Sequence, residues 1–340
     1  MSSNYIQRRY SRLIFSVIVL IMLVGVLSIL SISVGSAFIN LPESLKALVD
    51  SDNVDVYTRI IIWEIRVPRT LSAIFIGMLM ALAGLFMQTV TLNPLADPYL
   101  TGMASGALLG VSITIVLSPL IVSPYVIVIS AFFGALCAMI LTLLIASKFR
   151  LDPIGLILGG VAVSMIFYSF SAILQFIGGE KMVMIIIWSL GSLSTASWSR
   201  TWFTGITAII LIPLSIIMYK SLNALLLGDE NAQSIGVSPK LTRSFSLLIS
   251  SIATAISVSM FGVIGFVGLV APHLARLALR SGDHLIVIPV TCLVGSAIML
   301  LSDVIARIIG SPGEFPLTPI MSLIGAPLLI YLMSRRFKNG

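Results

Sequence analysis

Charged residues are scarce in this chain of 340 residues. They make up 10% of the sequence, hydrophobic residues make up 58%, and the mean hydropathy is +1.12. A soluble globular chain averages about 25% charged and roughly 45–50% apolar residues. No water-soluble fold of this length could hide so much apolar surface, so the composition excludes a soluble protein and predicts a membrane protein.

Cysteine and histidine are equally rare, with two of each. Cys137 and Cys292 fall inside apolar runs, which excludes a disulfide framework and a thiolate metal site; we expect both to pack in the core. His273 and His284 are too few for histidine-rich metal or catalytic chemistry. Because His273 directly follows Pro272, we expect a packing role with hydrogen-bonded nitrogens more than a metal or proton site.

Three catalytic motifs are also missing from the sequence. It has no Gly-Lys pair, so the phosphate-binding loop that ends in Gly-Lys-Ser/Thr is excluded. Neither the zinc motif H-E-x-x-H nor the nucleophile elbow G-x-S-x-G occurs. We therefore expect no catalytic, cofactor-binding or metal-binding residue, and any ATP must be hydrolysed by another chain.

In place of these motifs the chain has a series of apolar runs. About 20 apolar residues cross a hydrocarbon core roughly 30 Å thick. The first run is longer than the roughly 7–15 apolar residues of a cleavable signal and lacks an A-x-A site, so we expect it to be retained. The ten runs lie at about 13–35, 70–89, 100–118, 124–146, 154–177, 203–219, 244–262, 264–280, 286–305 and 317–333.

The basic residues predict how these runs are oriented. They are scattered between the runs and form no stripe, so despite the net charge of +7 a nucleic-acid partner is excluded. With both termini cytoplasmic, 13 of the 20 basic residues lie inside, as the positive-inside rule expects. Two polar stretches, Leu41–Glu64 and Ile185–Ser199, then lie outside, the second as a short helix dipping toward a pathway. The prediction is one all-α, polytopic transmembrane domain over residues 1–340.

Ionisable residues are almost absent from the middle of the runs. Asp303 and Arg307 lie toward the end of the ninth run, and Arg276 lies near the inner end of the eighth. A proton- or sodium-coupled carrier would place such groups near the bilayer midplane. The pattern favours an external energy source, and a secondary carrier, a channel and a membrane-embedded enzyme remain as alternatives.

Several motifs occur in one order along about residues 66–332, and together they resemble the FecCD-type permeases, the membrane subunits of type II ATP-binding cassette (ABC) importers. No single glycine carries the likeness. The matching residues are Arg66-Val67-Pro68-Arg69-Thr70-Leu71, Gly77, Ala81, Gly84, Gln88, Asn93-Pro94-Leu95-Ala96-Asp97-Pro98, Gly102, Gly106, Trp188, Gly191, Gly228, Glu230, Ala232, Gly236, Gly262-Val263-Ile264-Gly265, Pro272-His273, Arg276, Asp303, Arg307, Glu314, Pro316, Gly325 and Pro327.

The resemblance implies the assembly and its location. Each subunit would have ten helices and would form a homodimer in the lipid of the cell membrane, with the pathway at its centre. Two cytoplasmic ATPase subunits and an extracytoplasmic substrate-binding protein would complete the importer. The substrate would be a metal chelate, and iron-siderophore, haem and cobalamin all remain open. Thr318 and Leu328-Leu329 depart from the family pattern and put the pocket shape near the last run in doubt.

A polar segment at about 222–238, with a glycine near each end of its charged part, follows the sixth run on the inner side. Such a segment can form short helices lying along the membrane. The resemblance implies that this is the coupling loop received by the ATPase subunit. The residues assigned to coupling are Gly228, Asp229, Glu230, Ala232 and Gly236.

The second run ends at Asn93-Pro94-Leu95-Ala96-Asp97-Pro98, where two prolines cannot continue a helix and leave backbone groups free. A simple terminating turn would explain the prolines. The resemblance implies a cytoplasmic gate role for Asn93 and Leu95. The segment Asp152-Pro153-Ile154 stands where a second gate element would be, and it matches the family too weakly to carry that role.

Arg66, Arg69 and Arg307 are predicted at the outer ends of the second and ninth runs, against the general inside bias of positive charge. If a helix begins near Pro68, Arg66 and Arg69 can project together toward water. Snorkelling to lipid headgroups is the simpler explanation. The resemblance implies that the three arginines receive acidic residues of the binding protein.

Gly102, Gly106 and Gly110 recur every four residues, a spacing that lets helix backbones approach closely in lipid. We expect this stripe to serve packing within one subunit more than a seam between two copies.

Overall fold

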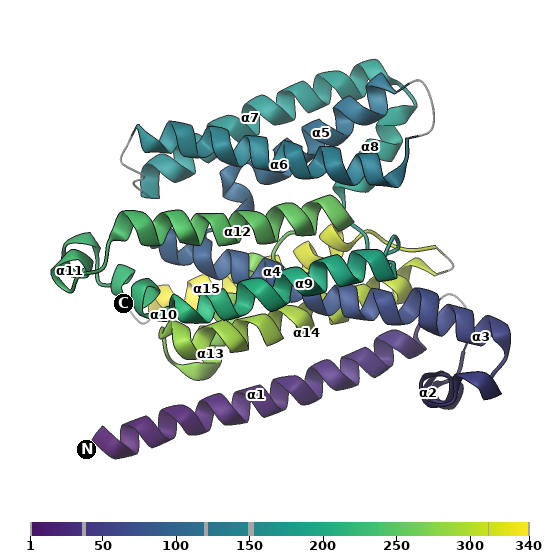
Figure 1. The fold of residues 1–340 in the computed structure, drawn as a ribbon, viewed down its shortest axis with the longest axis horizontal. Helices are drawn as coiled ribbons and strands as arrows, with labels where there is room; N and C mark the ends of the chain where they lie inside the picture. The colour runs from purple at the N-terminus through teal and green to yellow at the C-terminus, as the bar shows by residue number, and fades with distance from the viewer. Residues whose placement is uncertain (1, 36–38, 119–121, 149–152, 312, 339–340) are drawn as a thin grey trace.

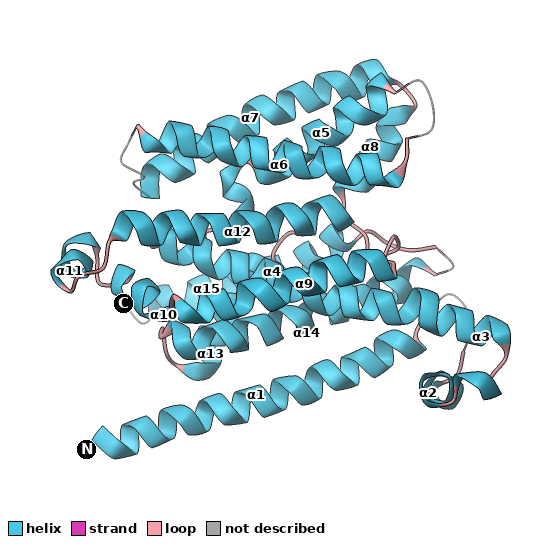
Figure 2. Cartoon of the chain, in the orientation of Figure 1, coloured by secondary structure: helices cyan, strands magenta, loops and turns pink. Residues whose placement is uncertain are grey.

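The computed structural model describes residues 2–35, 39–118, 122–148, 153–311 and 313–338. Within these ranges the regular structure is helical throughout, as Figure 2 shows. The main helices are α1 (Ser2–Ser33), α4 (Val67–Val90), α5 (Met103–Leu117), α6 (Pro124–Ser147), α7 (Pro153–Gly178), α9 (Trp198–Ile217), α12 (Pro239–Phe261), α13 (Val267–Leu279), α14 (His284–Gly310) and α15 (Leu317–Lys338). The shorter ones are α2 (Leu41–Val49), α3 (Val56–Ile60), α8 (Lys181–Ser189), α10 (Tyr219–Leu225) and α11 (Asp229–Ser234), with the single turns η1 (Ser51–Asn53), η2 (Ile61–Arg66) and η3 (Pro98–Thr101).

Each of the ten predicted apolar runs coincides with one of the main helices. In the described residues, 7 helical segments are long and apolar enough to cross a membrane, and three shorter apolar helices are Met103–Leu117, Val267–Leu279 and Leu317–Pro327. The break expected within 260–285 is present, because α12 ends at Phe261 and α13 begins at Val267. The all-α membrane fold is thus confirmed.

One boundary differs from the prediction. The helical segment of the second run begins at Val56, well before residue 70, and runs for 35 residues to Val90. Its turn Ile61–Arg66 is π-helical. Pro68 lies just after this turn, and the wider turn accommodates the proline ring, which would clash with the carbonyl of residue 64 in an α-helix. The stretch Leu41–Glu64 is therefore partly a continuation of the span.

The helices form two groups on either side of α12, as Figure 1 shows. The helices α5 to α8 lie on one side, and α4, α9 and α13 to α15 lie on the other, with α1 outermost. The two main apolar clusters follow this division, and α4 contributes to both. In the helical segment Val56–Val90, 78% of the most apolar 18-residue stretch is buried, against 6% of the corresponding stretch in α1. The core is therefore built around α4.

Close helix packing depends on glycine pairs. A Cβ added to Gly77 of α4 would lie 2.5 Å from the carbonyl oxygen of Gly295 in α14. On the other side, a Cβ on Gly106 of α5 would lie 2.3 Å from the carbonyl oxygen of Gly134 in α6. The predicted glycine stripe therefore packs within the subunit. Of the two cysteines expected in the core, Cys292 is buried, but Cys137 is exposed on α6, so that expectation was wrong for Cys137.

The molecule has two distinct ends along its helix axes (Figure 1). Both chain ends lie at the same end of the molecule as α11, and we call this the inner end. The helices α2, α3 and α8 lie at the opposite end, which we call the outer end. The two polar stretches predicted outside, Leu41–Glu64 and Ile185–Ser199, thus lie at the end away from α11.

Candidate functional site

The segment predicted to contact an ATPase lies at the inner end and contains α10 and α11 (Figure 1). The short helix expected between Gly228 and Gly236 is present. Gly228 has φ 90° and Gly236 has φ 82°, a region that only glycine adopts without strain. An added Cβ would meet no atom within 4 Å at either position, so the conformation and not the space requires glycine.

Hydrogen bonds at the end of α11 explain the conformation of Gly236. The N–H of Val237 donates to the carbonyl of Ala232 at 2.9 Å, and the N–H of Gly236 donates to the carbonyl of Gln233 at 2.9 Å. These two bonds form a Schellman motif, which places a left-handed residue directly after the helix. Ala232 is fully buried and anchors α11 against the rest of the chain.

Arg243 of α12 fixes the other end of α11. Its Nη1 donates to Oδ2 of Asp229 at 2.7 Å and its Nη2 donates to Oδ1 at 2.8 Å. This bidentate geometry is the strong form of an arginine–carboxylate pair. Glu230, the next residue, is exposed. Of the two acidic residues predicted for coupling, Asp229 therefore positions α11, and Glu230 faces outward.

The segment that carries Glu230 also exposes apolar side chains. Leu226, Leu227 and Ile235 are all exposed. An exposed apolar patch with a charged residue beside it is typical of a surface that contacts another protein.

A polar cluster that the sequence did not predict joins α10 to the bundle. The amide oxygen of Asn223 accepts the backbone N–H of His284 at 2.9 Å and lies 2.7 Å from its Nδ1. The Nε2 of His284 lies 2.8 Å from Oγ1 of Thr89 in α4. Asn223 also donates to Asp283 at 2.7 Å. The cluster connects the coupling segment with α4 and α14, and no local pattern marks Asn223.

The predicted gate loop begins where α4 ends. The N–H of Asn93 donates to the carbonyl of Gln88 at 3.1 Å, and that of Leu92 donates to Thr89 at 3.4 Å. This is a second Schellman motif, with Leu92 at φ 50° where glycine is usual. The carbonyls at this helix end are therefore partly capped, and the expectation of free backbone groups was wrong for Gln88 and Thr89.

Asn93 shapes the loop through its side chain. Its Oδ1 accepts the backbone N–H of Leu95 at 3.0 Å, which forms an Asx turn. Leu95 is 40% exposed and Leu92 is 47% exposed, so the loop presents two apolar side chains. Asn93 is in a position to set the direction of Leu95.

Side chains of neighbouring elements brace this loop. The hydroxyl of Tyr99 accepts the N–H of Ile264 at 3.0 Å, which ties η3 to the break between α12 and α13. Gln88 donates to the carbonyl of Leu269 at 3.1 Å and accepts from Arg276 at 2.6 Å. The sequence analysis gave Tyr99 no role. The other candidate gate element, Asp152-Pro153-Ile154, begins at a residue that lies outside the described residues.

The three arginines predicted to receive the binding protein are buried, including the two expected to project into water. Arg66, Arg69 and Arg307 are 3%, 5% and 5% exposed. The expectation of a freely accessible cationic pair was wrong, because acidic side chains and backbone carbonyls from distant parts of the chain enclose the guanidinium groups.

Two carboxylates neutralise part of this arginine cluster. The Nη2 of Arg69 donates to Oδ1 of Asp303 at 2.8 Å, and its Nη1 donates to Oε1 of Glu314 at 2.5 Å. Arg307 pairs with the second oxygen of Asp303 at 2.9 Å. The side chain of Asp303 is not exposed, and its two carboxylate oxygens bind Arg69 and Arg307.

Backbone carbonyls at the end of α1 satisfy the remaining donors. Arg66 donates to the carbonyls of Ile32 and Ser33 at 2.7 and 2.8 Å. Arg307 donates to the carbonyls of Ser31 and Val34 at 2.8 and 2.6 Å. The last carbonyls of a helix lack partners within the helix and carry partial negative charge. The two arginines therefore cap α1 and hold its outer end against α4 and α14.

Comparison with known proteins agrees with this arrangement. The FecCD transport family matches residues 20–335. The chain is 35% identical over 334 residues to the Fe(3+)-citrate import system permease protein YfmD of Bacillus subtilis, with 98% of each chain covered. It is 34% identical over 280 residues to the hemin transport system permease protein HmuU of Yersinia pestis, with 81% of this chain and 84% of that protein covered.

A solved structure shows the same fold. It is an ABC transporter of proposed metal-chelate type in an inward-facing conformation, with a TM-score of 0.83, 29% identity, and coverage of 94% of this chain and 98% of that one. The sequence match, the helical membrane fold and the order of the motifs agree, and the chain belongs to the FecCD transport family of ABC importer permeases, whose ATPase activity lies in separate subunits.

Proposed function

We propose that this permease carries a metal chelate across the cell membrane as a homodimer of ten-span subunits with cytoplasmic termini. Two ATPase subunits bind at the inner end, and a substrate-binding protein docks at the outer end. The observation that carries this proposal is α11, an exposed, glycine-bounded helix held to α12 by Arg243 in a chain of the FecCD family.

The inner surface supports the contact with the ATPase. Glu230 and several apolar side chains of the same segment are exposed, whereas Ala232 and Arg243 anchor the helix from below. A rigid exposed helix can transmit a push from a partner. The hydrogen bonds of Asp229 to α12, and those of Asn223 in the preceding helix α10 to the start of α14, leave this segment little freedom. The residues with a coupling role are then Gly228, Asp229, Glu230, Ala232 and Gly236.

The gate is proposed at Asn93 and Leu95. Tyr99, in the η3 turn that follows them in the chain, lines a pocket of about 440 Å³ between η3, α5, α7 and α8. Its lining mixes apolar side chains with the polar groups of Tyr99, Ser164 and Tyr168. Such a lining suits a chelate with an organic shell. Because Tyr99 also contacts Ile264, a shift of the α12–α13 break would move the wall of this cavity.

The docking role of Arg66, Arg69 and Arg307 takes an indirect form in this proposal. The arginines hold α1, α4 and α14 together and thereby shape the outer surface. Glu314, whose side chain is 33% exposed, is the member of the cluster that an approaching protein can reach.

Reconstitution of the purified components tests the proposal. Proteoliposomes that contain this chain, its ATPase and its binding protein are supplied with labelled ferric citrate, ferric siderophore, haem or cobalamin. We expect ATP-dependent uptake of one of these metal chelates, and this uptake should require all three components. The permease dimer of the active complex should contain two copies of this chain. An ATPase without its P-loop lysine is the control. Uptake by this chain alone, driven by a proton or sodium gradient, would contradict the proposal.

A further inference from the structure

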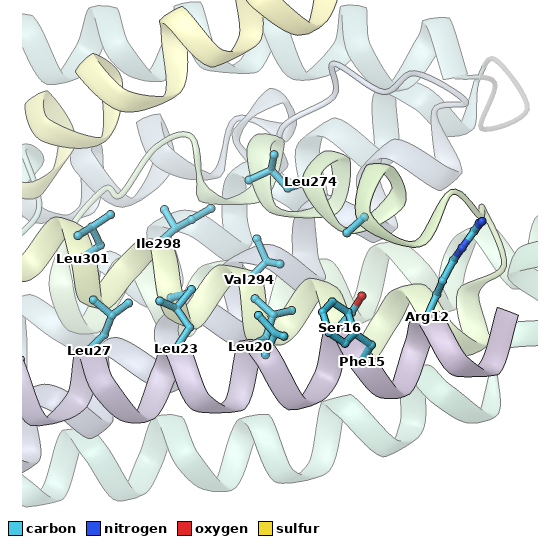
Figure 3. Close-up of a pocket in the computed structure, with 13 residues that line it drawn as sticks. Arg12, Phe15, Ser16, Leu20, Leu23, Leu27, Leu274, Val294, Ile298 and Leu301 are labelled. Carbon is cyan, nitrogen blue, oxygen red and sulfur yellow. The ribbon is translucent and has the colours of Figure 1, made fainter. Parts of the chain in front are cut away.

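An apolar groove separates α1 from α13 and α14, and we propose that it binds one anionic phospholipid. The groove has a volume of about 640 Å³. Figure 3 shows Leu20, Leu23 and Leu27 of α1 facing side chains of α14, with Arg12 at one end of the row. This inference depends on the membrane location of the chain and not on its transported substrate.

The groove follows from how α1 is attached. Its outer end is fixed by Arg66 and Arg307, which bind the carbonyls of its last turn. Along the rest of its length α1 packs loosely, because only 6% of its most apolar 18-residue stretch is buried. Figure 1 shows α1 as the outermost helix, running along the bundle from the inner to the outer end. A helix held firmly at one end and loosely along the rest leaves space that an apolar molecule can fill.

The shape and lining of the groove suit an acyl chain. The lining residues of α1 extend from Arg12 to Leu27, which at about 1.5 Å per residue corresponds to roughly 22 Å. One leaflet of the hydrocarbon core is about 15 Å thick, half of the total. Apart from Arg12, Ser16 is the only polar lining residue in the described part of the chain. A long, narrow and almost wholly apolar groove excludes a polar metabolite.

The charge at its inner end selects the headgroup. Arg12 is exposed, and no hydrogen bond or ion pair engages its side chain among the described residues. Arg280, also exposed, directly follows the last residue of α13, two residues after the lining residue Ala278. A guanidinium group binds phosphate oxygens through two parallel hydrogen bonds. Arg12 at the inner end of the groove, with a second cation two residues beyond the lining residue Ala278, favours a headgroup with net negative charge.

The full-length chain can be tested by native mass spectrometry in mild detergent, after incubation with equimolar phosphatidylglycerol and phosphatidylcholine. We expect one bound lipid per chain, with phosphatidylglycerol preferred. Arg12→Gln should lower the ratio of the two lipids roughly five-fold, as expected for one basic side chain at an anionic headgroup. Lys240→Gln, which removes another exposed cation at the inner end, should leave the ratio unchanged.

A second pair of variants tests the groove itself. Val19 lines the groove and is 41% exposed, whereas its neighbour Ile18 is 50% exposed and does not line it. Val19→Trp should fill the groove and remove the bound lipid of either type, and Ile18→Trp should retain it. Unchanged lipid number and ratio in both Arg12→Gln and Val19→Trp would overturn the proposal. A change of oligomeric mass in Val19→Trp without loss of lipid would assign the groove to a second copy and also overturn it.

Discussion

The two ends of this permease use the same ion pair in different surroundings. At the outer end, the side chains of Arg69 and Asp303 are 6% and 0% exposed. At the inner end, those of Arg243 and Asp229 are 7% and 44% exposed. The outer pair must be satisfied entirely by protein groups, whereas the inner carboxylate keeps contact with water. Burial of the acidic partner therefore decides whether the pair is structural or available for an interaction.

The outer cluster also has more charges to balance. Arg66, Arg69 and Arg307 face two carboxylates, so one positive charge is left over. The carbonyls at the end of α1 supply the missing negative potential. The cluster is neutralised only when α1 is in place, and this makes the outer end depend on α1, α4, α14 and the loop that carries Glu314.

Reversal of two buried charges should have the largest effect. The double variant Arg66→Glu with Arg69→Glu places two carboxylates against Asp303 and the carbonyls of α1. Among the described residues, Arg307 is then the one cation of the cluster that remains. We expect almost no folded protein, measured as monodisperse material after solubilisation and gel filtration. The matched double reversal at Lys240 and Lys220, both exposed, should fold normally. Wild-type yield together with loss of binding-protein docking would instead support an accessible arginine site.

Removal of one buried partner should have the next largest effect. Asp303→Ala leaves Arg69 and Arg307 without their shared carboxylate, and breaking a buried ion pair in this way costs about 3–5 kcal/mol. We expect a matching loss in the free energy of unfolding, measured by denaturant titration in detergent. Asp52→Ala is the control, because Asp52 pairs with Arg59 on an exposed surface, with side chains 86% and 54% exposed. Equal stability losses in the two variants would contradict the comparison.

At the inner end, removal of Asp229 should cost more stability than removal of Arg243. Asp229→Ala leaves the buried guanidinium of Arg243 without its partner, and the Nε of Arg243 already lacks one. The loss of hydrogen bonds to a charged group costs about 1.5–3 kcal/mol. Arg243→Met leaves Asp229, which water can solvate, and should cost only about 0.2–1 kcal/mol. Thermal unfolding of the two variants checks this order. A larger loss of stability in Arg243→Met than in Asp229→Ala would contradict it.

The sequence indicated much of the fold because helix spans and their ends are local features. Apolar runs predicted the main helices, and the polar segment between Gly228 and Gly236 predicted α11, whose ends depend on residues next to it. The break after Phe261 was likewise visible from its glycines. These features need no knowledge of distant contacts.

The contacts of the arginine cluster could not be foreseen in the same way. Arg69 is separated by 234 residues from Asp303 and by 245 residues from Glu314. The spacing of Arg66 and Arg69 suggested one exposed face, but the end of α1 binds the side chain of Arg66, and Asp303 and Glu314 bind that of Arg69. Asn223 and His284, 61 residues apart, were missed for the same reason. Burial of a charge depends on which segments pack over it, and a single sequence does not show this.

A modest change in stability is expected at the glycine after α11, and this position tests the coupling role most directly. Gly236→Val forces a β-branched residue into the left-handed conformation, at a cost of about 1–2 kcal/mol. No atom lies near the new side chain, so any effect comes from the backbone. Gly282→Val is the matched control, because Gly282 is also exposed at the inner end, has no positive φ, and its added Cβ would meet only Leu226 at 4.0 Å.

We expect Gly236→Val to fold and to assemble with the ATPase, because the anchors Ala232 and Arg243 are unchanged. Its Schellman motif would open, the end of α11 would lose its fixed direction, and ATP hydrolysis would no longer drive uptake. The measurement is the ratio of substrate imported to ATP hydrolysed in proteoliposomes, with Gly282→Val near the wild-type ratio. An unchanged ratio in Gly236→Val would remove α11 from the coupling path, while the ion pair of Asp229 with Arg243 would keep only its structural role.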